Sequence, residues 1–146
     1  MARWSACEAG VLELPSGRTV RGRSSRRAAE GAAADLTLRL GAFRPTGTCD
    51  RTTWIAWPDF GLPADRRAAA LALLDAWAHS DGERVDVTCR GGRGRTGTAL
   101  ACIAVIDGME AAAAIDLVRN KYHRGAIETP WQARYVASFG PATPPA

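Results

Sequence analysis

The sequence lacks a hydrophobic segment long enough to cross a membrane. Its longest strongly apolar run, Ala99 to Ile106, is far shorter than the ~20 residues that a spanning helix needs. The N-terminus has no continuous apolar stretch of the kind found in secretory signals, so we expect a cytoplasmic protein without membrane insertion. With 47% hydrophobic and 23% charged residues, the composition is ordinary for a globular protein and excludes a disordered, collagen-like or coiled-coil chain.

Paired cysteines are also lacking. Cys7, Cys49, Cys89 and Cys102 are scattered, with no C-x-x-C pair among them. A disulfide framework is not expected in a chain of 146 residues, which can bury a sizeable core and has no export signal. A zinc site lacks the closely spaced ligand pairs that such sites use. We therefore expect no metal and no other cofactor.

Lysine is almost absent, because every basic residue except Lys121 is an arginine. Arginine binds phosphate and carboxylate through two parallel hydrogen bonds, so the net charge of +4 favours an anionic partner. Genomic base composition explains the number of arginines equally well, so their positions must identify a site. No aromatic and basic platform supports binding of nucleic acid, and we expect none.

Alternating apolar residues and turn signals predict five strands, and helical spacing predicts four helices. The predicted strands are Val11–Leu14, Thr19–Gly22, Leu36–Leu40, Thr53–Trp57 and Val85–Thr88. The predicted helices are Ala64–His79, Thr96–Ile106, Ala111–Tyr122, and a last helix with Thr129 as N-cap and Pro130 at its first position. Residues 24–35 have no clear assignment. The order of elements predicts an α/β fold with helices packed on a small sheet.

Apolar spacing also predicts which faces of two helices are buried. In the first predicted helix, the apolar stripe consists of Ala70, Leu73, Leu74 and Trp77. The last helix is expected to carry Trp131, Tyr135 and Phe139 inward. We expect a single domain over residues 1–139, followed by a flexible tail over residues 140–146.

The segment from Val85 to Gly97 carries a recognisable chemical pattern. It joins a β-branched strand to an apolar helix through a loop with glycines at 91, 92 and 94. Glycines allow such a loop to turn its backbone N–H groups inward, and the helix N-terminus adds partial positive charge. Together these features predict a cradle for a tetrahedral anion such as phosphate.

Cys89 and Arg95 lie at the two ends of this loop. At the rim of the cradle, N–H donors and the helix dipole favour the thiolate of Cys89, which is the nucleophilic form. Arg95 can place its guanidinium against two phosphate oxygens, and Thr96 can donate a hydrogen bond to the sulfur. A buried cysteine beside a helix-capping arginine is the structural alternative, but it leaves the glycines and Arg95 unexplained.

A second candidate, Asp59, follows the predicted strand Thr53–Trp57. It lies in a loop bounded by Pro58 and Gly61, where a carboxyl group is free to move and can serve as a general acid. Taken alone, an aspartate in this setting is more often a turn residue. Together with Cys89, it is the proton donor that phosphate chemistry needs.

These motifs resemble a known family. The run CRGGRGRT at residues 89–96, a C-x5-R-T motif, resembles the active-site loop of the cysteine-based protein tyrosine phosphatases. The tripeptide WPD at residues 57–59 resembles that family's movable acid loop. The resemblance extends from about Thr53 to Phe139, and the compact spacing is more similar to the dual-specificity branch. It implies a central, mostly parallel sheet flanked by helices.

The resemblance implies a role for each matched residue. Cys89 is the nucleophile, Asp59 the general acid, Arg95 the phosphate clamp, and Thr96 the residue that eases departure of the sulfur. The residues expected to bind the phosphate are Arg90, Gly91, Gly92, Arg93, Gly94 and Arg95. Gln132 resembles the family's glutamine that positions the hydrolytic water, although its spacing from Thr129 is equally that of a capping box.

The chain departs from the family at two points. The family usually has histidine immediately before the nucleophile, where this chain has Thr88. No aromatic residue that walls a deep phosphotyrosine pocket is identifiable, although Trp131 offers one candidate. Cys102 is expected to pack in the interior, while Cys49 stands as a candidate resolving thiol for the nucleophile.

The pattern leaves three functions open. The leading hypothesis is hydrolysis of phosphotyrosine in proteins through a phosphocysteine intermediate, with phosphoserine and phosphothreonine as further substrates. Arg90 and Arg93 add positive charge to the loop, so a phosphoinositide or inositol phosphate phosphatase is the alternative. A non-catalytic module that binds phosphoproteins is the third hypothesis, but the presence of Cys89, Asp59 and Arg95 together argues against it.

Overall fold

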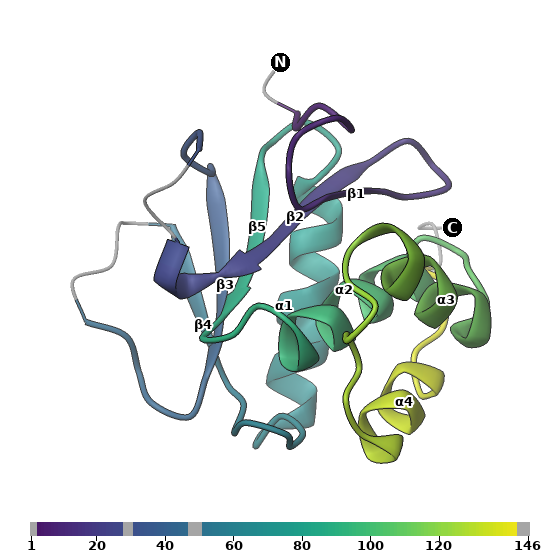
Figure 1. The fold of residues 1–146 in the computed structure, drawn as a ribbon. Coiled ribbons are helices and arrows are strands. Elements are labelled where there is room, and N and C mark those ends of the chain that lie inside the picture. The colour runs from purple at the N-terminus through teal and green to yellow at the C-terminus, as the bar shows by residue number, and fades with distance from the viewer. Residues whose placement is uncertain (1–2, 28–30, 47–50, 143–146) are drawn as a thin grey trace.

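A five-stranded sheet forms the centre of the fold. The computed structural model describes residues 3–27, 31–46 and 51–142, and within them the strand order is β1-β2-β5-β3-β4 (Figure 1). Strands β2, β5, β3 and β4 are parallel, while β1 pairs antiparallel with β2. The strands are β1 (Val11–Glu13), β2 (Thr19–Ser24), β3 (Leu36–Gly41), β4 (Thr52–Ala56) and β5 (Val85–Cys89). The predicted mostly parallel α/β fold is confirmed.

Strand β5 lies in the middle of the sheet, between β2 and β3, and all of its residues are buried. The carboxyl ends of parallel strands meet at one edge of a sheet, where α/β proteins commonly bind ligands. At this edge Cys89, the last residue of β5, pairs in register with Ser24, the last residue of β2. The loops that follow β2, β4 and β5 therefore converge around Cys89.

Helices pack beside the sheet and against one another. They are η1 (Ser25–Arg27, a 3-10 helix), α1 (Arg66–His79), α2 (Gly94–Ile106), α3 (Ala111–Lys121) and α4 (Pro130–Ala137). Helix α1 contacts β3 and β4, whereas α2 contacts β5, β2 and the other three α-helices. Every residue of α2 is buried, as its nearly continuous apolar sequence predicts. Figure 1 shows α2, α3 and α4 gathered on one side of the sheet.

The predicted buried face of α1 is partly wrong. The fully buried residues are Ala69, Leu73 and Ala76, whereas Leu74 is 42% exposed. Two of the three inward positions are alanines, whose small side chains allow α1 to lie close to its neighbours. The buried face of α1 does not follow the spacing of its most apolar residues, because Ala69 and Ala76 are less apolar than Leu74 and Trp77 yet occupy the interior.

The prediction that Trp131 points inward is also wrong. Trp131 is 45% exposed, whereas Tyr135 is buried and makes edge-to-face contacts with Trp57 and Phe139. Trp131 lies in the first turn of α4, beside the loop that follows β4, and its indole N–H donates a hydrogen bond to Phe60 O at 2.6 Å. The side chain covers that loop instead of entering the core.

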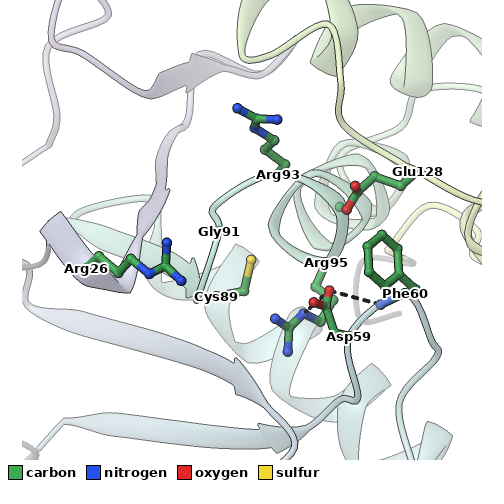
Figure 2. Close-up of a pocket in the computed structure, with 9 residues that line it drawn as sticks. Arg26, Asp59, Phe60, Cys89, Gly91, Arg93, Arg95 and Glu128 are labelled. Carbon is green, nitrogen blue, oxygen red and sulfur yellow. Dashed lines mark hydrogen bonds and ion pairs between the residues drawn. The ribbon is translucent and has the colours of Figure 1, made fainter.

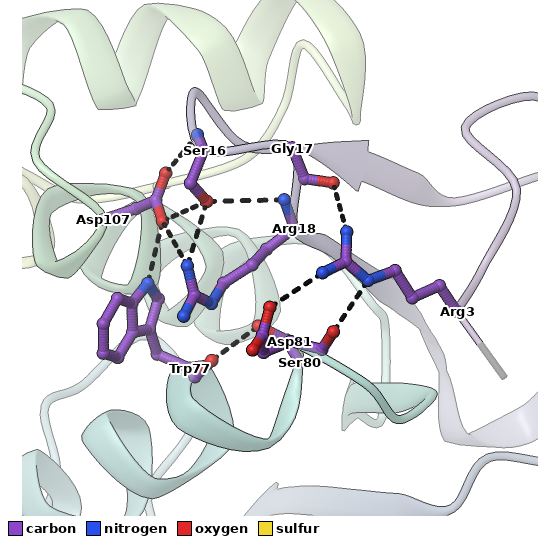
Figure 3. A network of polar contacts seen from close by, with 8 residues as sticks. All are labelled: Arg3, Ser16, Gly17, Arg18, Trp77, Ser80, Asp81 and Asp107. Atoms are coloured by element: carbon purple, nitrogen blue, oxygen red, sulfur yellow. Dashed lines mark hydrogen bonds and ion pairs between the residues drawn. The ribbon is translucent and has the colours of Figure 1, made fainter. Parts of the chain in front are cut away.

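A network of polar contacts closes the opposite end of α2 (Figure 3). Asp107, the C-cap of α2, accepts hydrogen bonds from Ser16 Oγ at 2.6 Å and Trp77 Nε1 at 2.8 Å. Arg18 lies 4.3 Å from the ring centre of Trp77. These contacts tie the β1–β2 turn and α1 to the end of α2 that is remote from Cys89.

The predicted C-terminal tail begins at Gly140. Within it, Ala142 donates its backbone N–H to Ile106 O at 2.9 Å. Residues 143–146 lie outside the described part of the chain.

Candidate active site

The loop after β5 wraps around the sulfur of Cys89. Cys89 is 2% exposed, and its Sγ accepts hydrogen bonds from Gly92 N at 3.2 Å and from Thr96 Oγ1 at 2.9 Å. The second contact is the one predicted from the sequence. Gly92 has a φ of 70°, and a Cβ there would lie 2.5 Å from the backbone N of Ser24, so this position requires glycine.

Helix α2 begins at Gly94, two residues earlier than predicted, so Arg95 belongs to its first turn. Arg95 is 6% exposed, and its Nη1 donates to Trp57 O at 3.0 Å. Its Nε is buried and has no hydrogen-bond partner among the described residues. A buried guanidinium donor without an acceptor is costly unless an anion completes it. Arg95 therefore fits the predicted phosphate clamp.

Two side chains support the loop from outside. Tyr122 Oη donates to Gly92 O at 2.5 Å, and Ser24 Oγ donates to Arg90 O at 2.6 Å. Burial, followed by the charges of Cys89 and Asp86, raises the pKa of Tyr122 well above its ordinary value. The phenol consequently remains protonated and keeps its hydrogen bond to the loop.

A buried ion-pair cluster lies on β5 and β2, next to the loop. Asp86 is fully buried and accepts two hydrogen bonds from Arg21, at 2.6 and 2.9 Å. It also forms an ion pair with Arg23 at 2.6 Å. Arg21 also lies 3.7 Å from the ring centre of Trp4. Separating a buried carboxylate from its arginine partners costs much free energy. This cluster therefore holds together the two strands that carry Ser24 and Cys89.

Asp59 lies on the other side of Arg95. Its Oδ1 is 3.6 Å from Arg95 Nε and accepts a hydrogen bond from Phe60 N at 3.0 Å, while the side chain is 62% exposed. Phe60 adopts a φ of 58°, which is uncommon for a residue with a side chain. The Asp59 carboxyl group is thus near the guanidinium and accessible from solvent.

Two side chains of α4 and one from the loop itself hold this acid loop, residues 57–61. In addition to the contact of Trp131 with Phe60 O, Gln132 Nε2 donates to Gly61 O at 3.2 Å. Trp57 Nε1 donates to the same oxygen at 2.8 Å. Gln132 is fully buried, its Oε1 accepts from Glu128 N, and its backbone N–H donates to the Thr129 cap, as a capping box predicts. Its side chain braces the acid loop and does not line the pocket.

These groups surround a pocket of about 280 Å³ (Figure 2). Of the predicted site residues, the lining includes Asp59, Cys89, Gly91, Arg93, Gly94 and Arg95. Thr96 lies behind the sulfur, Gly92 faces a neighbouring hollow, and Arg90 is exposed away from both. Arg90 and Arg93 thus differ: Arg93 faces the pocket, and Arg90 does not.

Three lining residues were missed from the sequence: Arg26, Phe60 and Glu128. Arg26 lies in the segment without an assignment, and Phe60 directly follows Asp59 in the chain. Glu128 immediately precedes the Thr129 cap, and a Cβ at Gly94 would lie 2.0 Å from its Oε1. A second carboxylate thus closes the pocket, and Phe60, not Trp131, supplies its aromatic side chain.

Thr88 and the other cysteines were also singled out from the sequence. Thr88 is buried at 3% exposure, and Cys102 is fully buried, as expected for a packing residue. Cys7, Cys89 and Cys102 are free thiols, whereas Cys49 lies outside the described residues. Among the described residues there is no cluster of potential metal ligands, and no helix is long and apolar enough to span a membrane.

Comparisons with solved structures agree with this architecture. The chain is similar to the crystal structure of Tk-PTP in its active form, with 21% identity, a TM-score of 0.65, and coverage of 88% of this chain and 95% of that one. It is also similar to the Trypanosoma brucei protein tyrosine phosphatase TbPTP1, with 14% identity, a TM-score of 0.67, and coverage of 86% and 69%. These likenesses show that the chain has a protein tyrosine phosphatase fold.

Sequence comparison identifies the family. The model described as PTP-SAK, Swiss Army Knife protein, DSP-PTPase phosphatase domain, matches residues 40–137. The chain belongs to this family. Two uncharacterized proteins of Methanocaldococcus jannaschii, MJECL20 and MJ0215, are 34% and 32% identical over 88 residues, which is 60% of this chain. The match covers 58% and 54% of the length of these two relatives.

Proposed function

We propose that this domain hydrolyses phosphotyrosine in proteins through a phosphocysteine intermediate. The observation that carries the proposal is the environment of one sulfur. Cys89 Sγ accepts hydrogen bonds from a loop amide and from Thr96, and it opens into a pocket shared with Arg95 and Asp59. A thiolate, an oxyanion clamp and a carboxyl group in one small pocket are the groups that phosphoryl transfer requires.

In the first step, the Cys89 thiolate attacks phosphorus and the bond to the leaving oxygen breaks. Asp59 gives its proton to that oxygen, so the leaving group departs as a neutral alcohol or phenol. Arg95 and the loop N–H groups bind the three remaining phosphate oxygens, which carry the charge in the transition state.

In the second step, water attacks the phosphocysteine and the sulfur–phosphorus bond breaks. Asp59, now a carboxylate, takes a proton from the water. The hydroxyl of Thr96 donates to the departing sulfur, which leaves as a thiolate and restores the starting state. In this scheme Trp131 and Gln132 act as positioning residues, because they contact the acid loop and not the reacting atoms.

The alternative substrate is an inositol phosphate or phosphoinositide. It is favoured by Arg26 and Arg93, which both line the pocket and add positive charge beyond Arg95. Phosphotyrosine remains the leading proposal because Phe60 supplies an aromatic side chain at the pocket and because a phenolate is a weaker base, and so a better leaving group, than an alkoxide. A non-catalytic phosphoprotein-binding module would have no use for Asp59 beside the clamp.

The test is a comparison of kcat/KM for phosphotyrosine, phosphoserine and phosphothreonine peptides with soluble phosphoinositides. We expect a phosphotyrosine peptide to be the best substrate. A phosphoinositide that is better by more than tenfold, about 1.4 kcal/mol of transition-state preference, would select the alternative. Tight binding without turnover of any of these compounds would select the binding module.

A further inference from the structure

A second hollow adjoins the pocket over Cys89. Its volume is about 870 Å³, compared with about 280 Å³ for the pocket, and lies within the ~300–1,000 Å³ range of ligand sites. Arg26, Gly91 and Arg93 line both. We call this hollow the basic groove, after its charged lining residues Glu8, Arg21, Arg23, Arg26, Arg27 and Arg93. A single phosphate group bound over Cys89 would occupy only the pocket and would not use this groove.

Positive charge dominates the groove. Arg21 and Arg23 both pair with the buried Asp86, so the exposed arginines carry the charge that matters for a ligand. Arg26, Arg27 and Arg93 are exposed and make no ion pair with another described residue, and Glu8 is the one carboxylate among the described residues that line the groove. Exposed cations that gather at one hollow raise the local concentration of anions.

The sheet explains why these arginines lie beside the active site. Because β2 is parallel to β5 and Ser24 pairs with Cys89, the chain that leaves β2 enters η1 beside the loop that follows β5. The hydrogen bond from Ser24 to Arg90 O fixes this approach. Figure 2 shows Arg26 and Asp59 on opposite sides of Cys89. The groove thus extends from the side of the pocket that the acid loop leaves open.

The lining of the groove leaves space beside its cations. Gly10, Gly31 and Ala32 contribute little or no side chain to it. An anionic group of a substrate can therefore approach Arg26 and Arg27 without displacing bulky residues. Guanidinium groups bind the oxygens of a phosphate through paired hydrogen bonds, and such contacts are stronger than those between neutral groups.

We propose that the basic groove binds a second phosphate group of the same substrate while the first phosphate lies over Cys89. The inference rests on the proposed phosphatase activity and narrows its substrates to multiply phosphorylated molecules. The second phosphate can belong to a neighbouring phosphorylated residue of a peptide or to another position of an inositol ring. Both present the same chemistry to Arg26, Arg27 and Arg93.

The test compares substrates that differ by one phosphate. The first pair is a phosphotyrosine peptide with and without a second phosphorylated residue nearby, and the second pair is an inositol monophosphate and a bisphosphate. We expect kcat/KM to be at least tenfold higher for one doubly phosphorylated member, and this preference to shrink as salt is added. The pair that shows the preference identifies the source of the second phosphate.

Two matched double variants locate the effect. In Arg26→Ala/Arg27→Ala, we expect the ratio between doubly and singly phosphorylated substrates to fall to near one. Arg66→Ala/Arg67→Ala removes the same charge from the exposed first turn of α1 and should leave the ratio unchanged. Affinities measured by calorimetry in the Cys89→Ser background should show the same ratios without turnover, and thermal melting checks that each variant is folded.

Three results would overturn the inference: a ratio near one for both substrate pairs in the unaltered protein, a ratio that persists in Arg26→Ala/Arg27→Ala, or an equal loss in both double variants. Hydrolysis of p-nitrophenyl phosphate separates this outcome from failure of the proposed function. If that simple ester is hydrolysed and the ratio is one, the basic groove has no part in recognition. If no phosphate ester is hydrolysed, the phosphatase proposal itself fails.

Discussion

The phosphate loop, residues 89–95, and the acid loop, residues 57–61, lie side by side but are held in place differently. The hydrogen bonds to Cys89 Sγ come from residues three and seven positions along the chain. The acid loop instead receives hydrogen bonds from Trp131 and Gln132, each 71 positions from its acceptor. Local contacts therefore hold the reacting sulfur, although Ser24 and Tyr122 support the phosphate loop from distant positions, whereas the contacts from α4 to the acid loop are all long-range.

The comparison predicts that the two loops fail in different ways. Damage to the phosphate loop should affect every substrate, because every substrate presents the same phosphate group. Damage to the acid loop should depend on the leaving group, because only poor leaving groups need a proton during cleavage.

The largest effect is expected for Cys89→Ser. Hydrolysis of an aryl phosphate should be abolished, since the serine hydroxyl is a much weaker nucleophile than a thiolate. Binding of a phosphate analogue such as tungstate should persist, because Arg95 and the loop amides remain. Calorimetry measures the binding, and unchanged turnover would remove Cys89 from the nucleophile's role.

Asp59→Asn should lower kcat by about 10²–10⁴ for alkyl or simple phenyl phosphates, the usual range for general acid catalysis. The loss should shrink for esters whose leaving groups have low pKa values. The measurement is a plot of log kcat against leaving-group pKa. An equal loss across that series would contradict the role of Asp59 as acid.

Trp131→Phe tests whether α4 positions the acid loop. The variant keeps most of the apolar area and loses the hydrogen bond to Phe60 O, which is worth about 0.5–1.5 kcal/mol. We expect kcat to fall by several-fold for poor leaving groups and little for good ones, a weaker copy of Asp59→Asn.

Trp77→Phe is the matched control for that variant, because it removes an indole donor at the opposite end of α2. It should lower the melting temperature without changing the leaving-group dependence. If both tryptophan variants respond alike, Trp131 acts through stability and not through the acid loop.

The smallest effect on chemistry is expected for Tyr122→Phe, which removes the hydrogen bond to Gly92 O. Stability should fall by about 1 kcal/mol, measured by urea unfolding, with a modest loss of kcat for all substrates alike. Loss confined to poor leaving groups would place Tyr122 with the acid loop instead.

The pH dependence of stability gives an independent readout at Tyr122. Because burial raises its pKa in the folded state, the contribution of the neutral phenol is complete below the ordinary value of about 10 and is lost as the pH rises above it. The alkaline decline in stability should therefore be shallower in Tyr122→Phe than in the unaltered protein.

Much of the fold could be predicted from the sequence. Turn signals and alternation located all five strands to within two residues at either end, and the Thr129-Pro130 pair located the start of α4. The inward face of α1 and the orientation of Trp131 could not be predicted. Apolar spacing predicts that a side chain is buried, but it does not show which element the side chain packs against. In both cases the neighbouring element decides which side chain is covered.

The sequence by itself determined the phosphate loop, because the parts of that site are consecutive in the chain and glycine at 92 is required by a local backbone conformation. It also determined that an aspartate follows the strand now seen as β4. Only the tertiary structure brought Asp59 to 3.6 Å from Arg95, placed Trp131 and Gln132 on the acid loop, and added Arg26 and Glu128 to the pocket. The physical reason is that these residues meet at the carboxyl edge of a parallel sheet, where the order of the strands and not the order of the residues decides which side chains become neighbours.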